Sequence, residues 1–237
     1  MASILKVNTI QDATNSNTAM TINSSGVVST PKQAGIYEHI VSKVSTSNSE
    51  LSGSTAASIR FQDVFTTDYI TYKLVIGFYG SAHTGGAHYV SFRWMNGSSE
   101  LTDANYRWHT QELSVNTTSY IGNNDNSDDR MRLFRNLNDN GDGTAQDTGL
   151  YGEIDMYGVI ATVISGTNTD RGSKHRPMMK SDLVGYNETL GAYIRSQSFG
   201  RYNNGSADTT FTGFAFMGET GELAGTYMSL FGLRVNS

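Results

Sequence analysis

The amino-acid sequence predicts an all-β protein, an antiparallel β-sandwich of the jelly-roll kind preceded by an extended N-terminal anchor segment. Short segments in which apolar and polar residues alternate recur along the chain, and such alternation is typical of half-buried strands. Clusters of Gly, Asn, Asp and Ser separate these segments and are typical of turns. No segment has a long apolar period of 3.6 residues, which disfavours helices and a parallel α/β fold.

The composition agrees with this fold class. Charged residues make up 16% of the chain and hydrophobic residues 37%, with 25 Gly, 13 Tyr and 2 Pro. This balance is poor in strong helix formers and rich in strand and turn residues. A chain of 237 residues is long enough for one large domain with a buried core and an accessory segment. We therefore expect an anchor segment at residues 1–35 and a sandwich domain at residues 36–237.

The anchor segment contains few large apolar residues. Two strand-like pieces, residues 4–10 and 18–30, are separated by the polar turn 11–17. A unit of fewer than about 40 residues without disulfides or metal does not normally fold alone. The segment therefore needs a partner, which is the following domain, identical copies of the chain or a different protein. The expected docking and oligomerisation side chains are Ile4, Leu5, Val7, Ile10, Met20, Ile22, Val27 and Val28.

The sandwich domain contains longer segments with strand patterns, many of them with aromatic residues. The clearest alternation places Tyr72, Leu74, Ile76 and Phe78 on one face of a strand. The predicted strands are 36–44, 71–79, 87–95, 105–115, 130–134, 151–164, 190–199, 209–217 and 226–235. The predicted turns are 80–86, 96–100, 122–129, 138–147, 165–172 and 202–208. Strands at this spacing favour an antiparallel sandwich or jelly roll.

Charge and residue usage exclude several function classes. The net charge of −5 disfavours non-specific nucleic-acid binding through a broad basic surface, and the basic cluster 171–180 is expected to be a solvated loop rather than a phosphate site. The absence of cysteine excludes disulfide frameworks and thiolate catalysis. The chain has no apolar run of about 18 residues and no signal-peptide pattern at its start. We expect a soluble protein made in a cytoplasm, without membrane insertion.

Edge protection points to assembly. Sheet proteins that stay monomeric commonly protect edge strands with Lys, Pro or bulges. The entire chain contains only six Lys and two Pro. We therefore expect neighbouring subunits to cover some strand edges.

The opening residues 1–31, MASILKVNTIQDATNSNTAMTINSSGVVSTP, resemble the start of virion proteins from marine bacteriophages, especially tail-fibre and related structural proteins of phages that infect cyanobacteria. The segments 61–76 and 209–235 resemble strands of β-rich phage virion domains. The similarity covers both ends and part of the middle of the chain. A chain of 237 residues leaves no room for an extended repetitive shaft, which departs from long tail fibres.

The resemblance implies a non-enzymatic structural protein on the virion surface, made in the host cytoplasm. Such a protein would be a short fibre, a decoration of the head, or an appendage attached to the neck or tail. It would dock onto other virion proteins through its N-terminal segment and display the sandwich outward, where it would recognise a host-surface glycan. A homo-oligomer is expected, with a trimer as the first expectation because similar phage fibres are commonly trimeric.

Two alternatives stay open at this point. The first is a polysaccharide depolymerase, for which Glu153 and Asp155 are the candidate carboxylates because residues two apart on a strand face the same side. Glycosidases need two carboxyls about 5–10 Å apart across a substrate, so an exposed polar face is the preferred interpretation and no catalytic residue is predicted. The second alternative is a cellular carbohydrate-binding module. No phosphate-loop, dinucleotide or nucleophile-elbow motif is present.

No cofactor is predicted, although two metal sites are considered. His83 and His88 flank a Gly-Gly turn and would form a zinc site with His109 if the loops converged; ordinary loop or strand histidines are the preferred interpretation. A calcium loop is the other alternative, because oxygen ligands recur at alternate positions, and a flexible acidic turn is preferred. The calcium candidates are Asn136, Asn138, Asn140, Asp142 and Asp147, with a weaker acidic pattern at 123–129.

Aromatic and amide side chains are the candidates for glycan contact, because sugar-binding surfaces combine planar rings with polar groups. Trp94 and Trp108 fall on predicted strands that follow one another in the sequence, and Tyr202 and Asn203 lie in a polar segment, residues 201–208. Core packing is the preferred interpretation for the two tryptophans. The four residues form the glycan-binding hypothesis.

Overall fold

The computed structural model describes residues 9–11, 18–22, 28–29, 37–45, 58–78, 88–114, 120–137, 150–159, 177–187, 190–203, 211–218 and 226–234. Every regular element in these ranges is a β-strand, which confirms the all-β class. The described part of the chain contains no helix long and apolar enough to cross a membrane.

The first seven strands are β1 (Thr9–Gln11), β2 (Thr18–Ile22), β3 (Val28–Ser29), β4 (Tyr37–Ser45), β5 (Ser58–Phe61), β6 (Tyr69–Phe78) and β7 (His88–Asn96). They are followed by β8 (Ser99–Glu100), β9 (Tyr106–Ser114), β10 (Tyr120–Asp128), β11 (Met131–Leu137), β12 (Leu150–Tyr157), β13 (Met178–Asn187), β14 (Ala192–Tyr202), β15 (Gly213–Gly218) and β16 (Thr226–Arg234).

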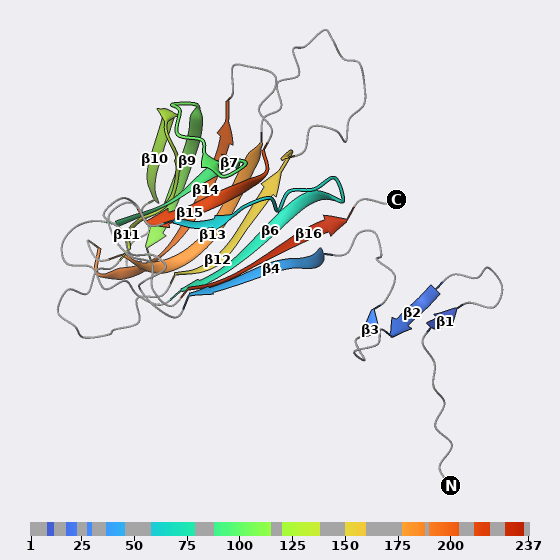
Figure 1. Ribbon diagram of the computed structural model, residues 1–237. Helices are drawn as coiled ribbons and strands as arrows, with labels where there is room; N and C mark the ends of the chain where they lie inside the picture. The colour runs from blue at the N-terminus through green and yellow to red at the C-terminus, as the bar shows by residue number, and fades with distance from the viewer. Residues whose placement is uncertain are drawn as a thin grey trace.

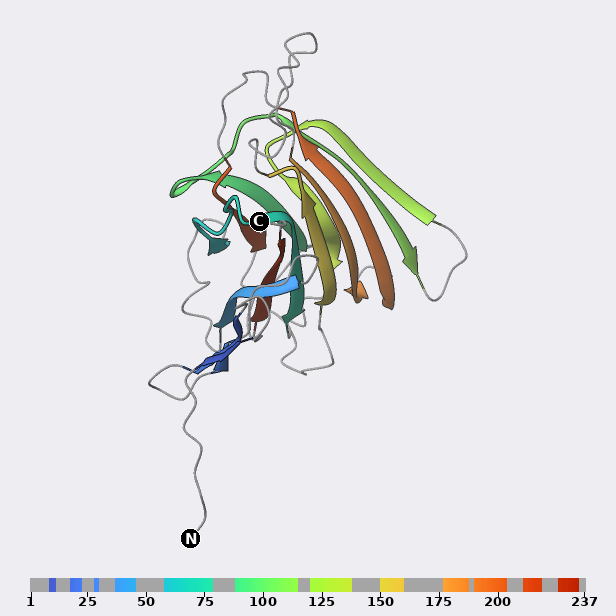
Figure 2. The same cartoon turned by 90° about the vertical axis from the view of Figure 1, so that its right-hand side faces the viewer.

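Strands β4 to β16 form a β-sandwich of two antiparallel sheets (Figure 1). The larger sheet has the order β4-β16-β6-β12-β13-β14-β9-β10, and the smaller sheet has the order β11-β7-β15-β5, with β8 paired to β7. A single pair, Leu137 with Asn187, joins the two sheets through β11 and β13. Figure 2 shows the strong curvature of the larger sheet, as expected from the twist of long strands.

Strict alternation gives the larger sheet one buried and one exposed face. On β6 the side chains of Tyr72, Leu74 and Ile76 are buried while Val75 points to solvent, as the sequence predicted. The strands β9, β13 and β14 show the same period of two over their full lengths. We call the buried face of the larger sheet the inner face and the other the outer face.

Aromatic rings fill the centre of the sandwich. Phe61, Phe92 and Phe214 stack on one another, with ring centroids 4.7 Å apart for Phe61–Phe214 and 5.3 Å apart for Phe92–Phe214. Trp94 meets Phe92 edge-on at 4.7 Å and is fully buried. Burial of a large aromatic side chain contributes about 2–3 kcal/mol to folding, so this cluster from β5, β7 and β15 holds much of the smaller sheet in place.

The strand β11 lies against the inner face of the larger sheet, and polar side chains satisfy its backbone there. Thr110 donates to the carbonyl oxygen of Arg132 at 2.8 Å, and Ser196 donates to that of Leu133 at 2.7 Å. Two further donors complete the row: Ser198 to the Leu133 carbonyl at 3.2 Å and Asn187 to the Arg135 carbonyl at 3.2 Å. We call these four side chains, Thr110, Asn187, Ser196 and Ser198, the donor row.

The donor row requires a close approach of β11 to β14. A Cβ atom added at Gly200 would lie 2.1 Å from the sulfur of Met131. Because Met131 is fully buried, its side chain has little room to move away. Glycine at position 200 therefore permits the contact on which the donor row depends.

Four strands lie outside the segments that the sequence predicted. Residues 122–129 were expected to form a turn, but most of them belong to β10, whose Asn and Asp residues are tolerated because β10 pairs only with β9 at the sheet edge. The basic cluster 171–180 was expected to be a loop, but β13 begins at Met178. The short strands β5 and β8 were also missed; β8 forms a tight hairpin with β7 around Gly97, whose φ is 57°.

The strands β1, β2 and β3 form a separate small sheet, which we call the N-terminal sheet (Figure 1). Ile22 pairs with Val28 in the antiparallel ladder of β2 and β3, so the two-strand pattern predicted within residues 18–30 is confirmed. The strand β1 adds to β2 with Ile10 opposite Met20. Among the described residues, the N-terminal sheet shares no backbone ladder with the sandwich.

Removing two members of the donor row should destabilise the sandwich without unfolding it. In the double variant Ser196→Ala/Ser198→Ala, the buried carbonyl of Leu133 loses both hydroxyl donors, so the free energy of unfolding should fall by about 2 kcal/mol. Denaturant titration followed by tryptophan fluorescence measures this change. The exposed Ser98→Ala serves as the control and should change stability by less than about 0.5 kcal/mol; an equal effect in both variants would contradict the role of the donor row.

Candidate functional site

The docking residues predicted in the anchor segment are only partly within the described chain. Ile10, Met20, Ile22 and Val28 lie on strands of the N-terminal sheet, whereas Ile4, Leu5, Val7 and Val27 lie outside the described residues. Directly paired residues in an antiparallel sheet belong to the same face, as do residues two apart on one strand. The pairs Ile10–Met20 and Ile22–Val28 therefore place four apolar positions on one face of this sheet.

The predicted carboxylate pair is held by a lysine. Glu153 and Asp155 lie on the outer face of β12, which confirms that they face the same side. Lys73 Nζ on β6 lies 2.7 Å from Glu153 Oε2 and 3.3 Å from Asp155 Oδ1. Both carboxylates thus belong to an ion-paired group on one face of the sheet, which differs from two carboxyls opposed across a substrate.

The metal candidates are not brought together within the described chain. His109 is exposed on β9, His88 and Asn136 lie on strands, and His83, Asn138, Asn140, Asp142 and Asp147 fall outside the described residues. Among the residues that the structure describes, no three His, Cys, Asp or Glu side chains gather into a metal-binding group.

The acidic pattern at 123–129 binds protein donors instead. Asp128 accepts a hydrogen bond from the Trp108 indole at 3.1 Å, and Asp125 accepts one from the backbone of Ser127 at 2.8 Å. Asp129 accepts hydrogen bonds from arginine side chains. These carboxylates serve to hold the end of β10 and the turn that follows it.

The glycan-binding hypothesis needs correction for the aromatic residues. Trp94 is 0% exposed, Trp108 7% and Tyr202 1%, so none of these rings presents a face to a ligand. The Tyr202 hydroxyl donates to Asp103 at 2.7 Å, and burial together with this bond raises its pKa to about 12. Trp94 and Trp108 also lie on different sheets, β7 and β9. All three belong to the core, as the preferred interpretation held for the tryptophans, and Asn203 directly follows Tyr202 beyond the end of β14.

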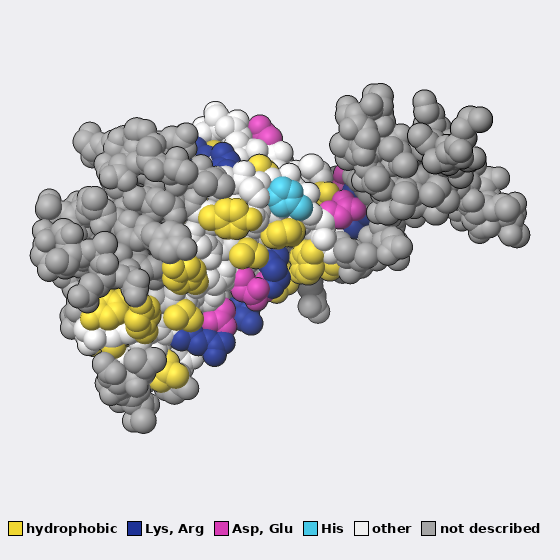
Figure 3. Space-filling view, turned by 90° about the horizontal axis from the view of Figure 1, so that it is seen from below, with side chains coloured by type: hydrophobic (Ala, Val, Ile, Leu, Met, Phe, Trp, Pro, Cys, Tyr) yellow, Lys and Arg dark blue, Asp and Glu magenta, His cyan; other side chains and the backbone are white. Residues whose placement is uncertain are grey.

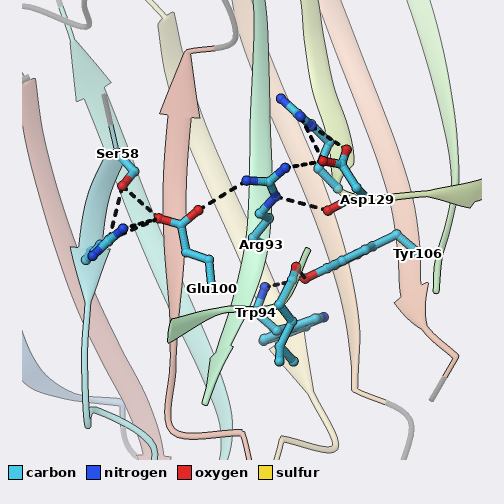
Figure 4. A network of polar contacts seen from close by, with 9 residues as sticks. Ser58, Arg93, Trp94, Glu100, Tyr106 and Asp129 are labelled. Carbon is cyan, nitrogen blue, oxygen red and sulfur yellow. Dashed lines mark hydrogen bonds and ion pairs between the residues drawn. The ribbon is translucent and has the colours of Figure 1, made fainter. Parts of the chain in front are cut away.

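A buried arginine organises the charges of the smaller sheet (Figure 4). Arg93 on β7 is only 8% exposed and binds Asp129 on one side and Glu100, at 3.3 Å, on the other. Glu100 also accepts hydrogen bonds from Ser58 at 2.9 Å and Arg60 at 3.0 Å. A buried guanidinium needs such partners because desolvation of an unpaired charge is costly. The network ties β5, β7, β8 and the start of β11 together.

A second buried charge pair lies beside the donor row. Glu112 on β9 is 1% exposed and binds Arg135 of β11 at 2.5 Å. Burial raises the pKa of Glu112, while the charge and hydrogen bonds of Arg135 act in the opposite direction. The second carboxylate oxygen, Oε1, has no hydrogen-bond partner in the structure. This pair joins the two sheets, and its residues were not singled out by the sequence.

A chain of hydroxyl and imidazole groups runs along the edge of the outer face. His39 Nε2 lies 2.8 Å from Ser42 Oγ, which lies 2.7 Å from Ser229 Oγ, and Ser229 donates to the Tyr227 hydroxyl at 2.8 Å. The register shift between Leu230 and Phe231 marks a bulge in β4, which brings His39 and Ser42 to the same side. A serine nucleophile would also need an oriented base and an oxyanion hole. Within the described residues, His39 makes no other side-chain hydrogen bond, so we interpret the chain as a surface hydrogen-bond network.

The outer face of the larger sheet carries exposed rings among charged groups. Tyr151, Tyr193, Phe199 and Tyr227 are each at least 40% exposed, and the ring of Tyr151 lies over Gly77 of the neighbouring strand. Figure 3 shows hydrophobic side chains on both sides of a band in which acidic and basic side chains alternate. Neither feature was found from the sequence, because cross-strand register decides which residues become neighbours.

No protein-family model matches the chain, and neither a curated protein nor a solved structure is significantly similar to it. The fold and its surfaces are therefore interpreted from the residues of this chain.

Removal of the buried guanidinium should destabilise the smaller sheet. In Arg93→Met, Glu100 and Asp129 lose their shared cation, and the free energy of unfolding at pH 7 should fall by about 3 kcal/mol. Arg60→Met removes an exposed partner of the same Glu100 and should cost less than about 1 kcal/mol. Equal losses in the two variants, measured by denaturant titration, would contradict the central place of Arg93.

The same network should give the protein an acid-sensitive stability. Hydrogen bonds from Arg130 and the charge of Arg93 hold the pKa of Asp129 well below its ordinary value of 3.8. A carboxyl with a lowered folded-state pKa stabilises the fold above its unfolded pKa and loses this contribution as the pH falls. Below about pH 4, the free energy of unfolding should therefore fall more steeply for the wild type than for Asp129→Asn.

Glu112 is the control for that measurement, because its pKa is shifted in the opposite direction to that of Asp129. Because its pKa is raised in the folded protein, its protonation stabilises the fold as the pH falls toward about 4.5. Glu112→Gln should remove this gain and leave the acid loss below pH 4 unchanged. Denaturant titrations at several pH values distinguish the two carboxyls, and identical pH profiles for all three proteins would overturn both assignments.

Proposed function

We propose that the protein is a non-enzymatic structural component that docks through its N-terminal segment and displays the β-sandwich. The observation that carries this proposal is the N-terminal sheet, in which four apolar positions share one face while the sheet forms no ladder with the sandwich. Three short strands bury too little apolar area to be stable alone. A partner that covers this face, or that adds a strand to its edge, supplies the missing burial.

Such a partner is either identical copies of the chain or a different protein. Identical copies would associate symmetrically and bury their apolar faces against one another. The apolar face of the N-terminal sheet and the resemblance of residues 1–31 to the start of phage virion proteins together support a short fibre, a decoration, or an appendage attached to the tail or neck of a virion. The trimer remains our first expectation for the assembly.

The chemistry of the described residues supports display rather than catalysis. The carboxylates Glu153 and Asp155 share the single cation of Lys73 on one face of the sheet. The hydroxyl of Ser42 forms hydrogen bonds with His39 and Ser229 as part of a surface hydrogen-bond network. A depolymerase requires opposed carboxyls at a cleft, and this arrangement supports that alternative less well.

Deletion of residues 1–30 should leave a folded sandwich and abolish assembly. We expect far-ultraviolet circular dichroism and thermal unfolding of the truncated protein to match those of the full chain. Light scattering should give a trimer mass for the full chain and a monomer mass for the truncation. If both are monomers, docking to another virion protein is the remaining form of the proposal, and it is tested by incorporation of each protein into particles. Loss of folding on truncation, or a trimer in both, would contradict an independent N-terminal docking segment.

A pair of point variants tests whether assembly depends on the apolar face of the N-terminal sheet or only on the presence of the segment. Ile22→Asp places a charge on the face shared by the four apolar positions, whereas Thr21→Asp places the same charge at the adjacent position of opposite parity. Ile22→Asp should abolish assembly and Thr21→Asp should retain it. Equal behaviour of the two variants would show that this face is not the contact surface.

A further inference from the structure

Two arginines face each other on the outer face of the larger sheet. Arg107 on β9 and Arg201 on β14 are direct partners in the antiparallel register. Side chains at such positions have Cβ atoms about 5 Å apart, and like charges there destabilise a sheet. Within the described part of the chain, neither guanidinium takes part in an ion pair or a side-chain hydrogen bond. The pair therefore has a repulsion that a bound anion would relieve.

An exposed ring lies in the next row of the same face. Phe199 on β14 is 53% exposed, the largest exposed fraction among the large hydrophobic residues of the described chain. Its direct partners are Lys180 on β13 and His109 on β9, and both side chains are exposed. Because Phe199 is two residues from Arg201 on the same strand, the ring and the arginine pair lie on one face. We call Arg107, Lys180, Phe199 and Arg201, with His109, the ring patch.

The charge of the outer face has the opposite sign to that of the chain. On the neighbouring strands β6, β12, β13, β14 and β9, the outer face carries five basic side chains, counted without His109, and three acidic ones. The chain as a whole has a net charge of −5. The acidic residues are already engaged: Lys73 binds Glu153 and Asp155, and Arg195 binds Asp182. Because Lys73 supplies one positive charge to two carboxylates and Lys180 lies opposite Asp155, the net positive charge of this face gathers at Arg107 and Arg201, where an approaching anion is attracted.

We propose that the ring patch is a binding site for an anionic polysaccharide. An exposed aromatic ring packs against the apolar face of a pyranose, and flanking guanidinium groups bind carboxylate or sulfate groups with two parallel hydrogen bonds. The patch spans the neighbouring strands β13, β14 and β9, which lie about 5 Å apart. Successive sugars of one polysaccharide chain would lie across these strands. The site belongs to the folded sandwich and does not depend on the proposed docking of the N-terminal segment.

The surroundings of the ring patch favour a polysaccharide over a nucleic acid. A nucleic acid carries a charge on every nucleotide and is bound by a continuous basic groove. Here the ring patch is bordered by the ion-paired groups of Lys73 with Glu153 and Asp155 and of Arg195 with Asp182, so its basic charge does not extend into a continuous groove. A polysaccharide with sparse charges suits this surface better. Its anionic group would bind the arginine pair, and its neutral sugars would lie on the ion-paired, hydrogen-bonding residues beside the patch.

Binding to defined polymers tests the proposal. Full-length protein is titrated, at low and at physiological salt, with two sparsely charged anionic polysaccharides, hyaluronate and xanthan, and with neutral dextran and oligothymidylate. We expect at least one of the two anionic polysaccharides to bind more than about tenfold tighter than neutral dextran, and more weakly at higher salt. Arg107→Gln/Arg201→Gln should weaken that binding about tenfold, and Phe199→Ala at least about threefold.

Matched variants keep the result interpretable. Lys43→Gln/Arg60→Gln also removes two positive charges, but from exposed positions on β4 and β5, and should leave binding unchanged within about twofold. Thermal unfolding of each variant shows that the sandwich is intact. The proposal is overturned if neither anionic polysaccharide exceeds neutral dextran, or if the two double variants weaken binding equally. Tighter binding of oligothymidylate with the same residue dependence would overturn it in favour of a nucleic-acid site.

Discussion

The β-sandwich depends on how one unpaired strand edge is satisfied. The strand β11 ends the smaller sheet, yet its open edge points into the protein against the inner face of the larger sheet. Buried carbonyl groups there need donors, since an unsatisfied one costs about 1–3 kcal/mol. The donor row of Thr110, Asn187, Ser196 and Ser198 supplies them. The row also sets the position of the smaller sheet, because hydrogen bonds have narrow ranges of length and angle.

This junction adds polar side chains to one part of the hydrophobic core. Near β5, β7 and β15 the core is aromatic and packed by ring contacts. Near β9, β11 and β14 the core also contains buried hydroxyl groups and the Glu112–Arg135 pair. The buried positions of β14 are mostly small residues there. Their size lets β11 approach closely, and their donors make that approach favourable.

The charges of the outer face follow from the alternation along each strand. Since the inner face is buried, the charged residues of these strands lie mostly on the outer face. Most of them pair across strands, as Lys73 does with Glu153 and Asp155. The ring patch differs in having basic residues opposite one another. The proposals for ligand binding and for docking thus rest on two separate surfaces, the ring patch and the apolar face of the N-terminal sheet.

The sequence by itself determined the all-β class, the antiparallel sandwich and most strand positions, because alternation along a single strand is a local property. It also determined that Glu153 and Asp155 share a face and that residues 18–30 hold two strands. Only the tertiary structure decided that Tyr202 is a core residue, that β10 and β13 are strands, and that Arg107 meets Arg201. These features depend on cross-strand register and on which sheet covers which face, and pairings between residues far apart in the chain are invisible to a local pattern.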